Sequence, residues 1–308
     1  MIPKFALATT LAFSLISLSH AYKQDANIIK VTKSNRTTPL SPEEQLAKFT
    51  LADGFVIELV ASEENGIINP IDLTFDDAGR LWTQTAEMYP LDPLGDRANR
   101  SIRGQLLDPK AKIHKHPEMV RLKKLYQLKD KGTDRIVVID DPTKPVEGQV
   151  RRVAEGLTMP QSILPYKNGV YVAHGSEMLY IEDADGDGIF ENPTTVLTGF
   201  SYIDTHTMSH LLTRAPGGWI NFSHGAMNLG EVTAVASGAK QQINYSKTAR
   251  FSLDGKKLEL VTSGLNNIWG YQLRANGQWY GSEANDKGMS VVPMESKTGY
   301  LGIGNDKL

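Results

Sequence analysis

Apolar and polar residues follow one another along this chain in a phrase that recurs four times. Each copy is a short apolar run, a polar turn with Gly, and a β-rich stretch that carries an aromatic residue. Such a phrase predicts a β-hairpin, because Gly adopts the positive φ angles that tight turns require. The copies span residues 73–82, 163–172, 211–220 and 271–280, with turn glycines Gly79, Gly169, Gly217 and Gly277.

Repeated hairpins at this spacing are typical of a β-propeller. The turn glycines are 90, 48 and 60 residues apart. An interval of 48 residues suits one four-stranded blade, and 90 suits a blade plus an insertion. We therefore expect an all-β fold, a six-bladed β-propeller over residues 41–308 that is cut short at the C-terminus. The alternative is a ring closed by blades that have lost the repeat.

Two elements are expected before the first copy. Polar residues 22–40 predict a linker, and Ser41-Pro42-Glu43-Glu44 then predicts a short helix that ends near Phe49. Ser and Glu at this spacing form a capping box, and Pro favours the first helical position. The apolar stretch 54–60 predicts the first strand.

A strongly basic insertion, residues 101–131, interrupts the repeat. Apolar residues recur with helical spacing after Pro117, which predicts a helix. Two interpretations are open: a solvated helical insertion, or a docking surface for an acidic partner or a membrane. Before Lys131 the insertion carries three acidic residues and eight basic ones, Arg103, Lys110, Lys112, Lys115, Arg121, Lys123, Lys124 and Lys129.

Composition bears on compartment and partners. Residues 1–21 have the pattern of a secretory signal peptide: Lys4, an apolar run over 5–18, and a small-residue cleavage site that ends at Ala21. We expect a secreted or periplasmic protein, since this run is short for a membrane span. The chain has no Cys, which excludes disulfides and covalently attached c-type haem within it. A net charge of −2 does not indicate nucleic acid as a partner.

Polar residues follow the second strand of each predicted hairpin. Because these positions are equivalent, their side chains should gather at one end of the propeller and form a ligand site. His174, His224 and Glu283 occupy such positions, and Asn285 follows Glu283 closely. The alternative for each histidine is a local hydrogen-bonding role.

The segment before the third copy holds two more histidines, His206 and His210. An imidazole with a pKa near neutrality is suited to removing a proton from an alcohol. His206 is the candidate general base. For His210, a hydrogen bond to a loop carbonyl is an equally good interpretation.

The phrase Asp183-Ala-Asp185-Gly-Asp187-Gly188 has the pattern of a calcium loop. Asp oxygens at positions 1, 3 and 5 converge on a hard cation, and Gly at position 6 makes the sharp turn. Glu191 at position 9 is a further candidate ligand, whereas position 12 is Thr194 and not Glu. We expect a shortened loop with a structural calcium ion. The alternative is an Asp-Gly hairpin without metal.

These motifs together resemble one family. Ser41-Pro-Glu-Glu, Gly54-Phe55, the run from Phe75 to Trp82, and Asp183 to Gly188 are similar to the N-terminal propeller region of PVC-type membrane-bound dehydrogenases. That family is similar to the soluble glucose and sorbosone dehydrogenases, six-bladed propellers that bind pyrroloquinoline quinone (PQQ) and calcium. Larger members add helical repeats and a cytochrome c domain. The resemblance covers residues 41–290.

The resemblance implies roles for particular residues. His206 matches the general base of the superfamily, and Glu283 and Asn285 match a polar loop of the cofactor site. In the phrase Gly264-Leu-Asn266-Asn267-Ile-Trp-Gly270, Asn267 and Gly270 match the superfamily. Asn266 stands where the superfamily has an Arg that engages the quinone, which removes a cation from the expected site.

We therefore expect a periplasmic, PQQ-dependent dehydrogenase that oxidises a sugar or another alcohol and passes electrons to a cytochrome c. One alternative is a non-catalytic propeller that binds carbohydrate or protein. Another is a calcium-dependent, lactonase-like hydrolase, for which Glu87, Asn228 and Asp286 are the metal ligands to consider.

Overall fold

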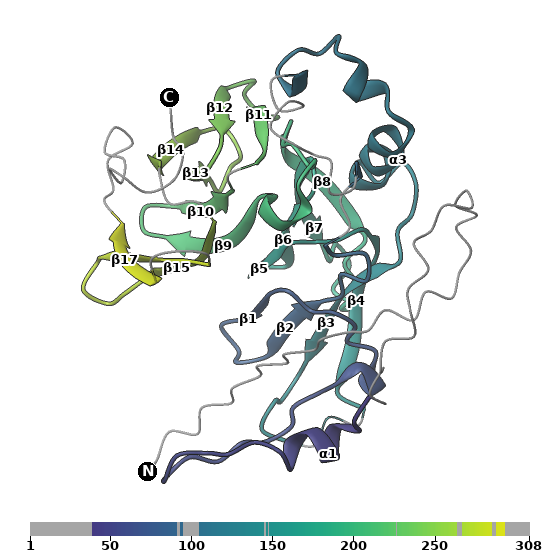
Figure 1. Ribbon diagram of the computed structural model, residues 1–308, viewed down its shortest axis with the longest axis vertical. Helices are drawn as coiled ribbons and strands as arrows, with labels where there is room; N and C mark the ends of the chain where they lie inside the picture. The colour runs from purple at the N-terminus through teal and green to yellow at the C-terminus, as the bar shows by residue number, and fades with distance from the viewer. Residues whose placement is uncertain are drawn as a thin grey trace, which may run out of the picture.

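The computed structural model describes residues 39–90, 93–94, 105–144, 146, 148–225, 227–263, 267–284 and 288–292. The predicted signal peptide and nearly all of the predicted linker lie outside these residues. The described chain is mainly β, with few helices and several antiparallel sheets (Figure 1), as predicted for the fold class. None of the described helices combines the length and apolar character needed to cross a membrane. The six-bladed propeller stays a prediction.

Four antiparallel sheets follow one another along the described chain. The first holds β1 (Leu73–Phe75), β2 (Leu81–Gln84), β3 (Asp134–Ile139) and β4 (Val150–Leu157). The second holds β5 (Ser162–Tyr166), β6 (Gly169–His174), β7 (Glu177–Glu182) and β8 (Asn192–Thr198), and the hairpin β11 (Leu229–Ala234) and β12 (Lys240–Asn244) extends it beyond β8. The third holds β9 (His210–Ala215), β10 (Trp219–His224), β13 (Lys247–Ser252) and β14 (Leu258–Ser263). The fourth holds β15 (Ile268–Leu273), β16 (Trp279–Glu283) and β17 (Gly288–Val292).

All four predicted hairpins are confirmed, since β1–β2, β5–β6, β9–β10 and β15–β16 pair as antiparallel neighbours. Gly79, Gly217 and Gly277 have φ angles of 81°, 81° and 80°, as the turn argument requires. The second copy differs, because the positive φ of 54° belongs to Lys167. Gly169 is needed there for space: a Cβ atom would lie 2.3 Å from the ring of Tyr180.

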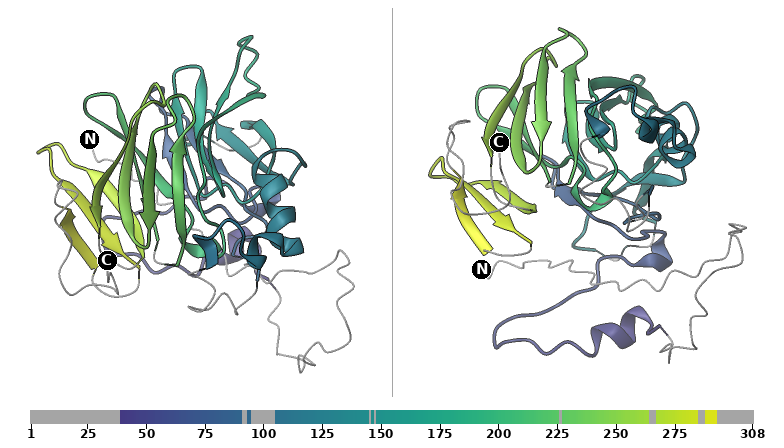
Figure 2. Two further views of the ribbon diagram at one scale, coloured as in Figure 1. Left: turned by 90° about the horizontal axis from the view of Figure 1, so that it is seen from above. Right: turned by 45° about the horizontal axis from the view of Figure 1, so that its top comes forward.

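The sheets pack face to face as successive layers (Figure 2). The first strands of neighbouring sheets touch in the order β1, β5, β9 and β15. Between the first and second sheets, Trp82 packs with Ile163 and Val172, and between the second and third, Leu164 packs with Phe222. A smaller core between the third and fourth sheets is built around Ile268, Tyr271 and Trp279.

The N-terminal predictions are met in part. α1 spans Pro42–Leu46, and Ser41 and Glu44 form the predicted capping box, although the helix ends before Phe49. The predicted strand over 54–60 is wrong, because this stretch pairs with no strand in the described chain. Phe55 and Val56 are 68% and 66% exposed there. A 3-10 helix, η1 (Glu63–Asn65), then leads to β1.

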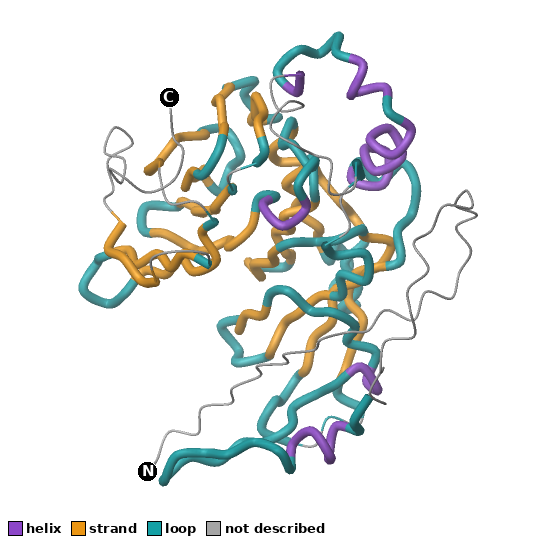
Figure 3. The backbone as a smooth tube through the Cα atoms, viewed as in Figure 1, coloured by secondary structure: helices purple, strands orange, loops and turns teal. Residues whose placement is uncertain are grey.

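The basic insertion contains the predicted helix. η3 (Lys112–Lys115) is followed by α3 (Pro117–Tyr126), at the edge of the molecule in Figure 3. The apolar side of α3 packs on the loops that lead to β5 and β9, where the Tyr202 hydroxyl donates to the Met119 carbonyl at 2.8 Å. The buried residues of this cluster are Met119, Leu122, Leu125, Tyr126, Met159, Tyr202, Ile203 and Met208.

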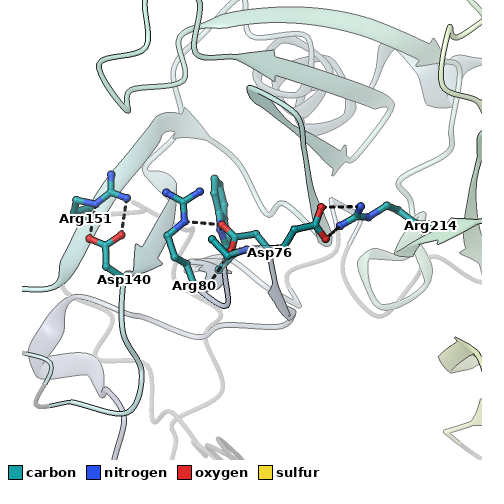
Figure 4. A network of polar contacts seen from close by, with 8 residues as sticks. Asp76, Arg80, Asp140, Arg151 and Arg214 are labelled. Atoms are coloured by element: carbon teal, nitrogen blue, oxygen red, sulfur yellow. Dashed lines mark hydrogen bonds and ion pairs between the residues drawn. The ribbon is translucent and has the colours of Figure 1, made fainter.

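Ion pairs tie the hairpin turns together at one end of the sheets (Figure 4). The Asp76 carboxylate accepts hydrogen bonds from Arg80 Nε at 2.6 Å and from the Trp82 indole at 2.9 Å, which closes the first turn. Its neighbour Asp77 pairs with both terminal nitrogens of Arg214, a residue of β9. The first and third sheets are therefore linked directly at this end.

Candidate functional site

The equivalent strand ends of the four hairpins lie opposite these turns. β2 ends at Gln84, β6 at His174, β10 at His224 and β16 at Glu283. Each strand runs away from its turn, so all four ends lie on the same side of the sheets, as the repeat predicts. The loops on this side carry the candidate catalytic residue.

His206 lies on the connection from β8 to β9, in the 3-10 helix η4 (Thr205–Thr207). Its side chain is 50% exposed, and Nδ1 lies 3.2 Å from Asp204 Oδ1. The same carboxylate oxygen accepts the backbone N–H of His206 at 3.1 Å and so caps the helix. A carboxylate that accepts from Nδ1–H leaves the lone pair on Nε2, which is the state that a general base needs.

The Asn228 side chain holds the connection from β8 to β9 in place through hydrogen bonds. Its Oδ1 accepts hydrogen bonds from the backbone N–H of Ile203 at 3.1 Å and of Asp204 at 3.2 Å, and from the Ser201 hydroxyl at 3.1 Å. Its Nδ2 donates to the Asp204 carbonyl at 2.8 Å and to Thr207 Oγ1 at 3.1 Å. Asn228 is fully buried. One amide therefore holds the backbone before His206 and the Thr207 side chain after it.

Tyr89 forms the neighbouring wall of the site. Its ring meets the ring of His206 edge-on, with centroids 5.8 Å apart. Asn69 Nδ2 donates to the carbonyls of Ala86 and Tyr89, both at 2.9 Å, and so fixes the loop that carries Tyr89. An aromatic ring beside an exposed imidazole offers an apolar face to a ligand that the imidazole contacts.

Asp134 joins this loop to the second sheet. Its carboxylate accepts from the Thr85 hydroxyl and the Glu87 N–H, both at 2.9 Å, and from the Met159 N–H at 2.7 Å. Burial raises its pKa above the usual value, although the three donors act in the opposite direction. Glu87 itself is partly exposed, 3.8 Å from Arg135 Nη2. Asp134 therefore supports the wall of the site and does not face it.

His174 lies beneath α3 and is fully buried. Its Nδ1 donates to the Tyr126 carbonyl at 3.0 Å, and its Nε2 accepts the Thr158 N–H at 2.9 Å. Burial lowers its pKa to about 4, so the ring is neutral. This geometry gives His174 a structural role in attaching the insertion, and its contact with a cofactor stays a prediction.

The histidines of the third sheet are also buried. His224 Nδ1 donates to the Tyr245 carbonyl at 3.1 Å, and burial lowers its pKa to about 4. His224 Nε2 has no hydrogen-bond partner in the described chain. The nitrogens of His210 lie against the carbonyls of Met208 and Ile268, and its ring stacks on Trp269 at 4.3 Å. His210 therefore has the structural role that the sequence left open.

The remaining predicted cofactor residues are only partly described. Asn267 is half-buried directly before β15, and its carbonyl accepts the Ala284 N–H at 2.9 Å. Glu283 is the last residue of β16. Asn266 and Asn285 lie outside the described residues. The cofactor-binding roles of all six residues stay predictions.

The predicted calcium loop connects β7 to β8. Oxygens of Asp183, Asp185 and Asp187 lie within 4.8 Å of one another, a group that does not include Glu191. Asp183 accepts the N–H of Gly186 at 2.7 Å and of Gly188 at 3.0 Å, which shapes the turn. The backbone N–H of Asp183 also donates to the Asn168 carbonyl, so the loop lies beside the β5–β6 turn. The seven residues of β8 run from this loop toward the connection that carries His206, so the two are separated by about 20 Å.

A groove of about 590 Å³ lies away from His206. It runs between β4 and the connection from β7 to β8, and its lining includes Lys131, Arg152, Glu155, Phe190 and Glu191. None of the residues that line it belongs to the loops that carry His206 and Tyr89. The groove is therefore no part of the candidate catalytic site.

The sequence interpretation missed two residues of the site. Asp204 lies two positions before His206, and an Asp at that spacing is a recognisable helix cap. Asn228 is considered there only as a metal ligand, and its amide is instead used by five hydrogen bonds to the loop. No local pattern marks Asn228, because its partners lie 21 to 27 residues earlier.

Residues 41–300 match the model of the DUF7133 family, which is described as a domain of unknown function. The chain belongs to the DUF7133 family. No curated protein matches it. The family match covers all four sheets and the basic insertion, so the site around His206 lies within the family domain.

Solved structures give only distant likenesses. A luciferin-regenerating enzyme is 10% identical, with a TM-score of 0.44, over 80% of this chain and 73% of its own. A polysaccharide lyase of family PL25, an ulvan lyase, is 13% identical, with a TM-score of 0.32, over 80% of this chain and 60% of its own. A protein from a Thermus species, named provisionally as an oxidoreductase (glucose dehydrogenase), is 12% identical, with a TM-score of 0.31, over 69% of this chain and 58% of its own. Likenesses this weak decide neither the number of blades nor the chemistry.

Proposed function

We propose that this DUF7133 chain is the propeller part of an oxidoreductase that oxidises a hydroxyl group of a sugar or another alcohol. The observation that carries the proposal is the exposed His206 imidazole held by Asp204 beside Tyr89. The matching hairpins and the contacts between successive first strands support a propeller arrangement, and its number of six blades rests on the family resemblance. Leu73 and Phe75 of β1 are 46% and 50% exposed, which is consistent with a further blade beside the first sheet.

His206 supplies the proton transfer. Nε2 accepts the hydroxyl proton while Asp204 holds the Nδ1 proton and stabilises the imidazolium that forms. Oxidation of the alcohol to a carbonyl compound would also need a bound two-electron acceptor, which would take the hydride from the carbon. Tyr89 would pack against the apolar face of a sugar ring and orient its hydroxyl toward Nε2.

The family resemblance alone points to PQQ as the group that would supply this redox chemistry. The described residues do not fit the cofactor well, because His174 and His224 are buried and engaged in the fold. Asn266 also replaces the expected Arg, so a cation that would meet an anionic tricarboxylate is missing. We therefore route no step through this cofactor. A cytochrome c acceptor and a periplasmic location are proposed on the same resemblance and on the sequence of residues 1–21.

A structural calcium ion is proposed in the loop from β7 to β8. Three carboxylates converge there, and two backbone N–H groups hold the Asp183 carboxylate in place. Because the loop lies at the end of the sheets away from His206, such an ion would stabilise the second sheet and would not contact the substrate.

The experiment is a dye-reduction assay on purified protein with added PQQ and calcium, using a panel of sugars and alcohols. His206→Ala should lower kcat by about 100-fold or more, the usual contribution of a general base. Asp204→Asn should lower it by at least about tenfold, since the imidazole loses its orientation. Asn276→Ala changes an exposed side chain in the turn between β15 and β16 and serves as the control, which should leave kcat unchanged.

Two results would contradict the proposal. Turnover that survives His206→Ala would show that another group takes the proton. A protein that binds sugars but turns over none, with or without His206, would be the non-catalytic propeller. The lactonase-like alternative is less well supported, because the Asn228 amide is engaged by the loop that carries His206.

A further inference from the structure

The exposed side of the insertion is lined with lysines. Residues 105–131 carry eight basic and three acidic residues, whereas the whole chain has a net charge of −2. The lysine ridge is formed by the exposed residues Lys110, Lys112, Lys115, Lys123, Lys124 and Lys129. The only ion pair that forms within η3 and α3 in the described chain joins Arg121 to Glu118. The ridge therefore presents an almost uncompensated positive charge.

The ridge lies next to the candidate catalytic loop. The Tyr202 hydroxyl donates to the Met119 carbonyl of α3, and Tyr202 is only two residues before Asp204. Met88 and Tyr89 pack against the same apolar cluster as α3. A ligand that lies along the ridge would therefore reach the surface beside His206.

The chemistry of the ridge indicates which partner it fits. The apolar side of α3 packs on the protein, so it is not available to enter a lipid bilayer. Protein interfaces are rich in aromatic residues and Arg and poor in Lys, whereas the ridge offers Lys without an exposed aromatic side chain. Proteins that bind single-stranded nucleic acid typically combine a basic surface with aromatic side chains on which bases stack, and the ridge has no such exposed ring. Point charges on flexible stems suit a linear polyanion that is held by diffuse attraction.

We infer that the lysine ridge binds an acidic polysaccharide and guides a hydroxyl of that chain to His206. Binding to the ridge is independent of catalysis, and only the statement that the bound chain is the substrate rests on the proposed function. A polysaccharide with one carboxylate on each sugar supplies both the regular negative charge for the ridge and the hydroxyl groups for the imidazole. The substrate class would then be acidic carbohydrate and not a neutral sugar.

The test compares binding of the full chain to alginate, a polyuronate, and to dextran, a neutral glucan. The ridge variant changes Lys110, Lys112, Lys115 and Lys124 to Gln. The control variant changes four exposed lysines elsewhere to Gln, namely Lys48, Lys167, Lys240 and Lys256, so both variants lose the same charge. Circular dichroism checks that both are folded.

The wild type should bind alginate but not dextran at low salt. The ridge variant should bind alginate at least about tenfold more weakly, with a slope of log K against log salt that is shallower by about 3, as expected for four lost contacts to a single-stranded polyanion. The control variant should stay within about twofold of the wild type. His206→Ala should bind alginate normally, which separates a failure of binding from a failure of the proposed catalysis.

Several results would overturn the inference. The wild type could bind no alginate, or bind dextran equally well. The ridge variant could bind as tightly as the wild type, or the control variant could lose as much affinity as the ridge variant. Tighter binding to single-stranded DNA, polyglutamate or phosphatidylglycerol vesicles than to alginate would assign the ridge to a nucleic acid, an acidic protein or a membrane instead.

Discussion

Replacing Asn228 by Ala should loosen the loop that carries His206. The change removes five hydrogen bonds at once, two from backbone N–H groups, one to a backbone carbonyl and two with hydroxyls. The hydroxyls of Ser201 and Thr207 can rotate toward other partners, whereas the backbone groups of Ile203 and Asp204 cannot. Three backbone groups therefore carry most of the cost.

The magnitude follows from the cost of leaving such groups without a partner. A buried polar group that loses its hydrogen bond costs about 1–3 kcal/mol. Water can enter the space left by the amide, so the lower value applies, and three groups give about 3 kcal/mol. That is a large share of the roughly 5–15 kcal/mol that stabilises a typical protein. With a urea dependence of about 3 kcal/mol per molar, the unfolding midpoint should fall by about 1 M.

Two measurements check this prediction. Urea unfolding followed by the fluorescence of the four tryptophans gives the change in the free energy of unfolding. Hydrogen exchange of a peptide that covers residues 200–208 reports the loop directly, and the amides of Ile203 and Asp204 should exchange faster in the variant. Asn276→Ala, at an exposed turn where the side chain bonds only to Gln278, is the matched control and should change either measurement little. An unchanged midpoint together with unchanged exchange in Asn228→Ala would refute the view that this amide holds the loop.

Three further predictions concern other parts of the fold. Burial raises the pKa of Asp72 from 3.8 to about 6, so the folded chain holds this proton more tightly than the unfolded chain and loses stability as the pH rises from about 4 to 6. Asp72→Asn should remove up to about 3 kcal/mol of that loss of stability. The urea midpoints of the variant at pH 4 and pH 7 should therefore differ less than those of the wild type. Gly175→Ala should destabilise the protein by about 1–3 kcal/mol more than Gly277→Ala and should expose α3 to limited proteolysis. Both glycines have positive φ, but only at Gly175 would a Cβ atom meet another side chain, the Tyr126 ring, at 2.3 Å. Equal effects of the two substitutions would contradict this prediction. Asp183→Asn should abolish any rise in melting temperature that calcium gives the wild type, and a rise that persists would place the ion elsewhere.

The hairpins were predictable from sequence because each is a local structure. In the first copy, the Asp76 carboxylate accepts the N–H groups of Ala78 and Arg80 and the indole of Trp82, all within six residues. The stretch 54–60 has an equally β-like composition but no partner strand in the described chain. Strand pairing depends on a distant segment, so composition alone could not decide it.

Burial explains why the candidate site was predicted only in part. His174 and His224 are the last residues of equivalent strands and precede a Gly, as a propeller site would suggest, yet both are buried. No local pattern marks the segments that cover them, because Tyr126 lies 48 residues before His174 and Tyr245 lies 21 residues after His224. His206 has no such cover, and the carboxylate that orients it is close in sequence.

The two segments that cover these histidines also define where the site can be. The basic insertion follows β2 of the first sheet, and the hairpin of β11 and β12 follows β10 of the third, yet both lie against the second sheet. α3 closes the end of β6 through the Tyr126 carbonyl, and β11 pairs with β8 at Thr198 and Leu197. The connection from β8 to β9 passes between these two segments and carries His206 to the surface. A repeated fold has several equivalent strand ends where a site could form. In this chain the two covering segments bury the ends of β6 and β10 and leave the connection from β8 to β9 exposed. The same insertion that buries His174 therefore brings the lysine ridge beside the one catalytic candidate that stays exposed.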